Sequence, residues 1–150
     1  MEPLDLRQGP PRSGYAELDG LMVMPRTIDK LRAQLPGGNP GIYFINGRIK
    51  GISGYLLERL GVTETDLRET VARAANEDEV AAWLRERTDA SQYSAINATL
   101  RRIKPKHSQD EAYFRSEYAE TLRRHPELEF VLDIVDADDR RLFAADPRRR

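Results

Sequence analysis

The sequence contains no cysteine and only two histidines, His107 and His125, among its 150 residues. A chain without cysteine forms no disulfide, offers no thiol nucleophile and builds no cysteine-bound zinc site, and two histidines are too few for a histidine-rich metal centre. No apolar run approaches the roughly 18 residues that a membrane span needs, and the first residues lack the pattern of a signal peptide. We therefore expect a cytoplasmic protein with no metal, no cofactor and no membrane partner.

An excess of charge of one sign is also missing. Lys and Arg number 24 and Asp and Glu number 25, so the formal net charge is -1. Proteins that bind nucleic acid usually have an excess of basic residues, and this chain has none, so we expect no nucleic-acid partner. With 39% hydrophobic and 33% charged residues the composition is that of a soluble globular protein. We expect a single domain over residues 1–150, because a chain of this length can bury one core.

Most of the chain has the apolar spacing and the terminal signals of helices. Ile28, Leu31 and Leu35 fall on one face of a helix that begins near Thr27, and Gly37-Gly38 would end it. Two later helix starts carry capping boxes, in which Thr63 is paired with Asp66 and Asn76 with Glu79. The whole pattern predicts a mainly α fold, a single-domain bundle of about seven helices.

The last third of the chain leaves one element undecided. The apolar run in residues 126–135 is too short to distinguish helix from strand, although Glu127 and Glu129 in its first turn favour a helix. Asp136 is expected to cap a last short helix that ends near Phe143. Residues 146–150 are expected to form a frayed tail.

Two segments are not expected to be helical. Gly9, Pro10 and Pro11 disfavour regular structure, so residues 1–19 are predicted to form an extended N-terminal arm. Residues 41–52 place Asn46-Gly47 between β-prone runs, and this dipeptide tolerates the positive φ angles of a type I′ turn. We therefore predict one small β-hairpin at residues 41–52.

Several motifs of the first 90 residues resemble one family. They are Pro11-Arg12-Ser13, Gly20-Leu21, Leu60-Gly61, Trp83 and, most specifically, the Arg-x-x-Asp-Lys-x-Arg sequence from Arg26 to Arg32. In these motifs the chain resembles the bacterial domain of unknown function 5069. Where relatives have Gly-Glu-Tyr-x-Tyr-x-Cys, this chain has Gly41-Ile42-Tyr43-Phe44-Ile45-Asn46, so a role that needs that Glu or Cys does not carry over. The resemblance implies neither a substrate nor a reaction.

The motif from Arg26 to Arg32 belongs to a larger set of cations. Arginine's planar fork and lysine's point charge both suit a phosphate or carboxylate, and the start of a helix near Arg26 would add free amides. The alternative is that Asp29 pairs with Arg26 or Arg32 and the remaining charges solvate a helix face or clamp the N-terminal arm. The residues proposed to bind an anionic ligand near the hairpin are Arg12, Arg26, Lys30, Arg32, Tyr43 and Arg48.

Lys30 and Asp29 are also the candidates for a catalytic role. A lysine whose pKa is lowered by burial can form a Schiff base or act as a general base, but burial is not visible in a sequence. The acidic cluster at Asp133, Asp136, Asp138 and Asp139 does not have the spacing of an EF-hand loop, and helix capping explains it as well as a metal does. Phosphate loops, nucleophile elbows and dinucleotide fingerprints are absent.

Two functional hypotheses follow from these patterns. The first is a binding protein for a small anionic molecule, which it could also turn over. The second is an interaction module, in which the hairpin or a helix face meets a partner protein or a second copy of the chain. The sequence leaves open the ligand, the existence of a reaction and the oligomeric state.

Overall fold

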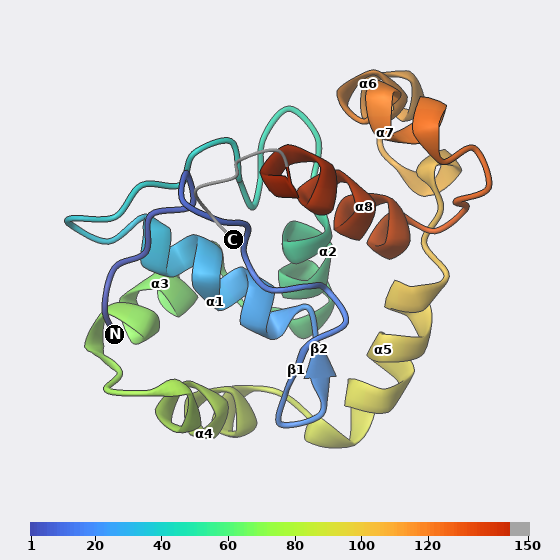
Figure 1. The fold of residues 1–150 in the computed structure, drawn as a ribbon. Coiled ribbons are helices and arrows are strands. Elements are labelled where there is room, and N and C mark those ends of the chain that lie inside the picture. The colour runs from blue at the N-terminus through green and yellow to red at the C-terminus, as the bar shows by residue number, and fades with distance from the viewer. Residues whose placement is uncertain (145–150) are drawn as a thin grey trace.

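The computed structural model describes residues 1–144, and within them the fold is mainly helical with one small hairpin, as predicted (Figure 1). Eight α-helices are present in this part of the chain, where about seven were expected. The helices are α1 (Met24–Ala33), α2 (Ile52–Leu60), α3 (Glu64–Arg73), α4 (Glu77–Arg87), α5 (Tyr93–Arg101), α6 (Glu111–Glu117), α7 (Ala119–Arg124) and α8 (Val131–Ala144). The strands are β1 (Glu17–Leu18) and β2 (Leu21–Met22), and short 3-10 helices are η1 (Ala90–Gln92) and η2 (Pro105–His107).

Helix α1 lies in the middle of the molecule, with α2 and α3 packed against it (Figure 1). All of its ten residues except Arg32 are buried. Of the predicted stripe, Ile28 and Leu31 are fully buried, whereas Leu35 lies beyond the end of α1 and is only partly buried. Pro25 lies in the first turn, where a missing N–H costs nothing. Because charged residues of this helix are buried as well, they must find partners inside the protein.

The hairpin prediction was wrong in its position. The antiparallel pair is β1 with β2, joined by Asp19 and Gly20, whose φ angles of 54° and 80° are both in the left-handed region that a tight hairpin turn needs. Residues 41–52 contain only an isolated antiparallel bridge between Asn46 and Lys50. The Lys50 amide donates to the side chain of Gln109 at 2.8 Å, so this segment is an irregular loop held partly by a distant side chain.

The two helix starts predicted from capping residues at Thr63 and Asn76 agree with the structure. The Thr63 hydroxyl and the Asn76 side-chain oxygen each accept a hydrogen bond, from the amides of Asp66 and Glu79, both at 3.1 Å. Gly61 ends α2 with a φ of 69°. These signals are local, which is why the sequence alone located them.

Helix α8 replaces two elements that were expected to be separate. It starts at Val131 and runs without a break to Ala144, so Asp136 lies inside it, and the prediction that Asp136 caps a last short helix is wrong. The Asp136 carboxylate instead accepts a hydrogen bond from Ser13 at 2.8 Å. The structure therefore answers the question left open for residues 126–135: the helix begins at Val131, and the residues before it are not a strand.

The N-terminal residues run along α1 and are held by backbone hydrogen bonds. The amide of Leu4 donates to the carbonyl of Arg32 at 3.2 Å, and that of Leu6 donates to the carbonyl of Asn39 at 2.8 Å. The tail predicted for residues 146–150 lies outside the described residues. In the described part of the chain, none of the helices combines the length and the apolar character needed to cross a membrane.

Candidate functional site

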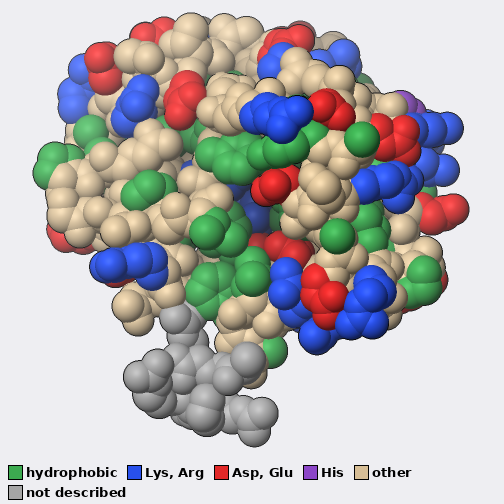
Figure 2. Space-filling view, turned by 90° about the horizontal axis from the view of Figure 1, so that it is seen from above, with side chains coloured by type: hydrophobic (Ala, Val, Ile, Leu, Met, Phe, Trp, Pro, Cys, Tyr) green, Lys and Arg blue, Asp and Glu red, His purple; other side chains and the backbone are tan. Residues whose placement is uncertain are grey.

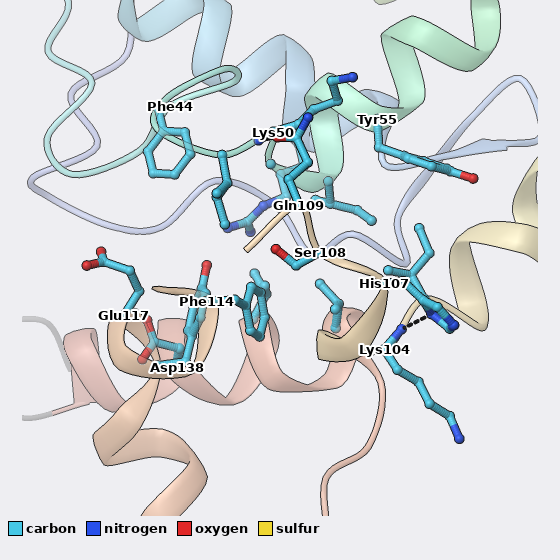
Figure 3. Close-up of a pocket in the computed structure, with 18 of the residues that line it drawn as sticks. Phe44, Lys50, Tyr55, Lys104, His107, Ser108, Gln109, Phe114, Glu117 and Asp138 are labelled. Carbon is cyan, nitrogen blue, oxygen red and sulfur yellow. Dashed lines mark hydrogen bonds between the residues drawn. The ribbon is translucent and has the colours of Figure 1, made fainter. Parts of the chain in front are cut away.

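A cavity of about 880 Å³ opens between two parts of the chain that are distant in sequence. The loop of residues 42–52 and the start of α2 form one wall, and α6, η2 and α8 form the other (Figure 3). In Figure 2 this face of the molecule shows a hollow whose walls are largely hydrophobic and whose depth holds both basic and acidic side chains. Its apolar and aromatic lining includes Ile49, Tyr55, Phe114, Val131 and Val135.

Arg26 and Asp139 form a buried ion pair on the wall of this cavity. The Nη1 atom of Arg26 lies 2.7 Å from Oδ2 of Asp139, and it also donates to the carbonyl of Arg12 at 3.1 Å. The other oxygen of Asp139 accepts a hydrogen bond of 2.7 Å from the Tyr43 hydroxyl. Burial, and then the Asp139 carboxylate, raise the pKa of Tyr43 well above its ordinary value, so Tyr43 stays protonated as the donor.

Lys30 lies one helical turn beyond Arg26, on the same face of α1, and it also lines the cavity. The residue is only 5% exposed, and its Nζ donates to the carbonyl of Phe44 at 2.9 Å. Burial is the main reason that its pKa falls to about 7, the charge of Arg26 lowers it further, and the Asp139 carboxylate offsets part of this fall. No carboxylate of residues 1–144 forms an ion pair with it, so Lys30 is divided between amine and ammonium near neutral pH.

The facing wall adds polar groups to an aromatic surface. Figure 3 shows Glu117, Phe114 and Asp138 across the opening from Phe44 and Lys50. Asp138 accepts hydrogen bonds from Thr121 at 2.6 Å and Arg141 at 3.1 Å, so its charge is already compensated. Burial raises the pKa of Tyr118, which also lines the cavity, to about 12. This wall is therefore apolar in its middle and polar where α6 and α7 meet α8.

The structure brings only three of the predicted ligand-binding residues together: Arg26, Lys30 and Tyr43. The other three predicted residues face elsewhere. Arg12 donates to Asp29 at 3.0 Å and pairs with Glu77, which fastens the N-terminal arm to α1 and α4.

Arg32 and Arg48 are not part of the cavity lining, although Arg48 contacts Tyr113, which is. Arg32 donates to the carbonyl of Glu2 at 2.7 Å. Arg48 lies 3.6 Å from a carboxylate oxygen of Asp110, and its guanidinium carbon is 4.3 Å from the centre of the Tyr113 ring. Clamping of the N-terminal arm, the alternative considered for these cations, thus describes Arg12 and Arg32.

Asp29, the proposed partner of Lys30 in catalysis, lies on a different side of α1. Successive residues of a helix are about 100° apart, so neighbours in sequence do not share a face. Both oxygens of Asp29 accept hydrogen bonds from Arg12, and the residue is not part of the cavity lining. Lys30 therefore has no acidic neighbour from its own helix.

Sequence reasoning missed the contribution of α8. Val131, Ile134 and Val135 form the buried stripe of this helix, and Asp138 and Asp139 continue the same stripe one turn later. Charged residues that continue a buried apolar stripe must be paired inside the protein. The helical spacing of Asp138 and Asp139 from Val131 and Val135 is the feature of the sequence that could have predicted their burial. The four aspartates 133, 136, 138 and 139 have separate partners, and no group of three metal-ligating side chains occurs within residues 1–144.

The family profile described as Domain of unknown function (DUF5069) matches residues 8–141. The match extends well beyond the first 90 residues, in which the sequence motifs carried the resemblance. It includes Arg26, Lys30 and Tyr43 together with Asp139 of α8. No curated protein matches the chain.

Proposed function

The chain belongs to the family of the domain of unknown function 5069, whose name specifies no ligand, and we propose from its cavity that it binds a small molecule with an apolar body and one negative charge. The proposal depends on the position of Lys30. This buried lysine forms no ion pair with a carboxylate among the described residues, and it lies on the wall of a large and mainly apolar cavity.

The size and lining of the cavity support a small organic molecule. Its volume of about 880 Å³ lies in the range of sites for drug-sized ligands, which are usually lined by apolar and aromatic groups with few polar ones. Ile49, Tyr55 and Phe114 offer such a surface. A ligand that covers them gains roughly 25 cal/mol for each Å² of apolar surface removed from water.

The charges around Lys30 favour a single negative charge on the ligand. Arg26 is neutralised by Asp139, so that pair adds no net charge to the site. Lys30 supplies at most one positive charge. Among the other lining charges, Lys50 pairs with Glu58 and Asp138 with Arg141, while Arg102 and Glu117 have opposite signs and offset each other. A carboxylate therefore suits the site better than a phosphate dianion.

The test uses 3-phenylpropanoate as a model monoanion with an apolar body. We expect it to raise the melting temperature of the wild-type protein, while 3-phenylpropan-1-ol and inorganic phosphate raise it less. Because a bound carboxylate favours the charged form of Lys30, binding at about pH 8 should take up protons, which calorimetry in buffers of different ionisation enthalpy detects.

Two variants complete this test. Lys30→Met should lose the preference for the carboxylate over the alcohol, and Lys106→Met, which changes an exposed lysine of η2, should behave as wild type. If 3-phenylpropanoate binds equally well to Lys30→Met, or causes no shift in the folded wild type, the proposal is wrong.

A second proposal, self-association or protein binding, is favoured by the loop at the mouth of the cavity. Ile42 is 68% exposed and Phe44 is 40% exposed, and both are large apolar side chains. If this loop is an interface, sedimentation velocity should show a mass that grows with concentration in the wild type and not in Ile42→Ser. A mass that stays that of the monomer at all concentrations removes self-association.

A further inference from the structure

Lys30 differs from the other lysines of the chain in both burial and contacts. Lysine occurs at positions 30, 50, 104 and 106, and only Lys30 is buried. Lys50 pairs with Glu58, and the side chain of Lys104 points away from the cavity in Figure 3, toward the ring of Phe130. The Lys30 Nζ has one hydrogen-bond acceptor, the Phe44 carbonyl at 2.9 Å, and lies on the cavity wall.

We propose that Lys30 is a nucleophilic amine, which forms an imine with the aldehyde or ketone group of a molecule bound in the cavity. This inference rests on the proposed function, because it needs a small molecule in the same cavity. It goes further by assigning the chemical class of the ligand, a carbonyl compound with an apolar body. It also assigns a covalent step to one atom, Nζ of Lys30.

The site holds the amine in the form that this step requires. Only a neutral amine has the lone pair that attacks a carbonyl carbon. Burial and the neighbouring positive charge of Arg26 both disfavour the ammonium form, a combination known to activate lysine nucleophiles. The Asp139 carboxylate acts in the opposite direction and offsets part of this effect. The other charged groups that line the cavity are Lys50 with Glu58 beside α2, Arg102 after α5, Lys104 before η2, Glu117 on α6 and Asp138 on α8.

The step balances without an oxidant or a reductant. The Nζ lone pair forms a C–N bond to the carbonyl carbon, while the carbonyl oxygen gains a proton and the nitrogen loses one, which gives a carbinolamine. Its hydroxyl group then takes up a proton and leaves as water, and the nitrogen lone pair forms the C=N bond, which gives the protonated imine. Loss of the remaining N–H proton, which replaces the proton taken up by the hydroxyl group, gives the imine. The one hydrogen-bond acceptor at Nζ, a backbone carbonyl, leaves the lone pair of the amine available for this attack.

The apolar lining limits which carbonyl compounds reach Lys30. Phe44 and Phe114 lie on opposite sides of the opening in Figure 3, so a hydrocarbon or aromatic body between them is removed from water. Small hydrophilic aldehydes gain nothing from these contacts. We therefore expect selectivity for carbonyl compounds that carry an aromatic or aliphatic group.

The experiment is reductive trapping with 3-phenylpropanal and sodium cyanoborohydride on the full chain at about pH 8, where ordinary lysines are almost fully protonated. The reagent delivers hydride to the imine carbon and fixes the adduct, and peptide mass spectrometry then locates it. We expect Lys30 to be modified at least about tenfold faster than Lys106, the exposed reference lysine. Addition of 3-phenylpropanoate, which occupies the cavity but forms no imine, should slow the labelling of Lys30 and not that of Lys106.

Each outcome decides between the two proposals. Labelling of Lys30 no faster than that of Lys106 overturns the imine, even when 3-phenylpropanoate binds and the proposed binding function stands. Fast labelling of Lys30 without any binding of 3-phenylpropanoate supports the amine nucleophile and overturns the monoanion as the ligand. Lys30→Met must lose the fast adduct while keeping its circular dichroism spectrum, and fast labelling that persists at another residue in this variant also overturns the assignment.

Discussion

Arg26 and Asp139 lie 113 residues apart and meet in a buried ion pair, in which Nη1 of Arg26 is 2.7 Å from Oδ2 of Asp139. The pair connects the middle helix α1 with the last described helix α8. Tyr43 from the loop at residues 42–52 joins it through the second oxygen of Asp139. One carboxylate thus links three segments of the cavity wall.

Removal of Arg26 should destabilise the fold strongly. In Arg26→Met the Asp139 carboxylate keeps the hydrogen bond from the Tyr43 hydroxyl but loses the cation with which it is paired. A buried charge left without its partner costs about 3–5 kcal/mol. Urea unfolding followed by circular dichroism measures the change. As a control, Glu111→Gln breaks the exposed pair with Arg115 and should cost less than about 1 kcal/mol. Equal costs for the two variants would contradict a buried, energetically coupled pair.

Replacement of Lys30 should stabilise the folded protein at neutral pH, in contrast to the replacement of Arg26. The pKa of Lys30 falls from 10.5 to about 7 on folding, so between these values the unfolded chain binds more protons than the folded protein does. Wild-type stability therefore rises with pH through this window. Lys30→Met lacks this dependence, and at pH 7 or below it should be more stable than wild type by about 3 kcal/mol, after allowance for the lost hydrogen bond to Phe44.

The pH dependence is the decisive part of this prediction. The advantage of Lys30→Met should shrink as the pH rises from about 7 and should vanish near pH 10, because the pH then approaches the ordinary lysine pKa, above which the side chain is neutral in both states. Lys106→Met, an exposed control, should follow the wild-type curve throughout. A constant difference between Lys30→Met and wild type across this pH range would show that the lysine is not held partly neutral by the fold.

The local part of the fold could be predicted from the sequence. The apolar stripe of α1, the caps at Thr63 and Asn76 and the stop at Gly61 depend on residues within one or two turns. Arg26 and Lys30 could be placed on one helix face by their spacing of four. Their burial could not, because it depends on α8 and on the loop at residues 42–52.

The hairpin shows how tertiary contacts override a local preference. Asn46-Gly47 and Asp19-Gly20 are both dipeptides that favour a hairpin turn, yet only Asp19-Gly20 forms one among the described residues. The loop around Asn46 is instead held by distant groups: the Gln109 side chain binds the Lys50 amide, and Nζ of Lys30 binds the Phe44 carbonyl. Such contacts leave no periodic signal in the sequence.

The observed hairpin has a distant support of its own, the side chain of Asn97. Its Oδ1 accepts from the amide of Met22 at 2.9 Å, and its Nδ2 donates to the carbonyl of Gly20 at 2.8 Å. Asn97→Ala leaves both backbone groups without these partners, so we expect a loss of about 2–4 kcal/mol in the free energy of unfolding. Ser94→Ala, at an exposed position of the same helix, should change it by less than about 0.5 kcal/mol. A loss below about 1 kcal/mol for Asn97→Ala would mean that water replaces the side chain.

A variant of Arg12 tests whether the contacts that hold the N-terminal arm to α1 and α4 are independent of the cavity. The guanidinium group of Arg12 holds Asp29 and Glu77, and it lies outside the cavity lining, although the sequence placed Arg12 among the cations proposed to bind the ligand. Arg12→Ala should lower the free energy of unfolding by about 1–3 kcal/mol, because the buried Asp29 carboxylate keeps only the backbone amide of residue 12. The affinity for 3-phenylpropanoate, measured by calorimetry on the folded protein, should stay within about twofold of wild type. Gln8→Ala, an exposed change in the same arm, should alter neither quantity. A tenfold or larger loss of affinity in folded Arg12→Ala would place Arg12 in the binding site and contradict the separation seen here.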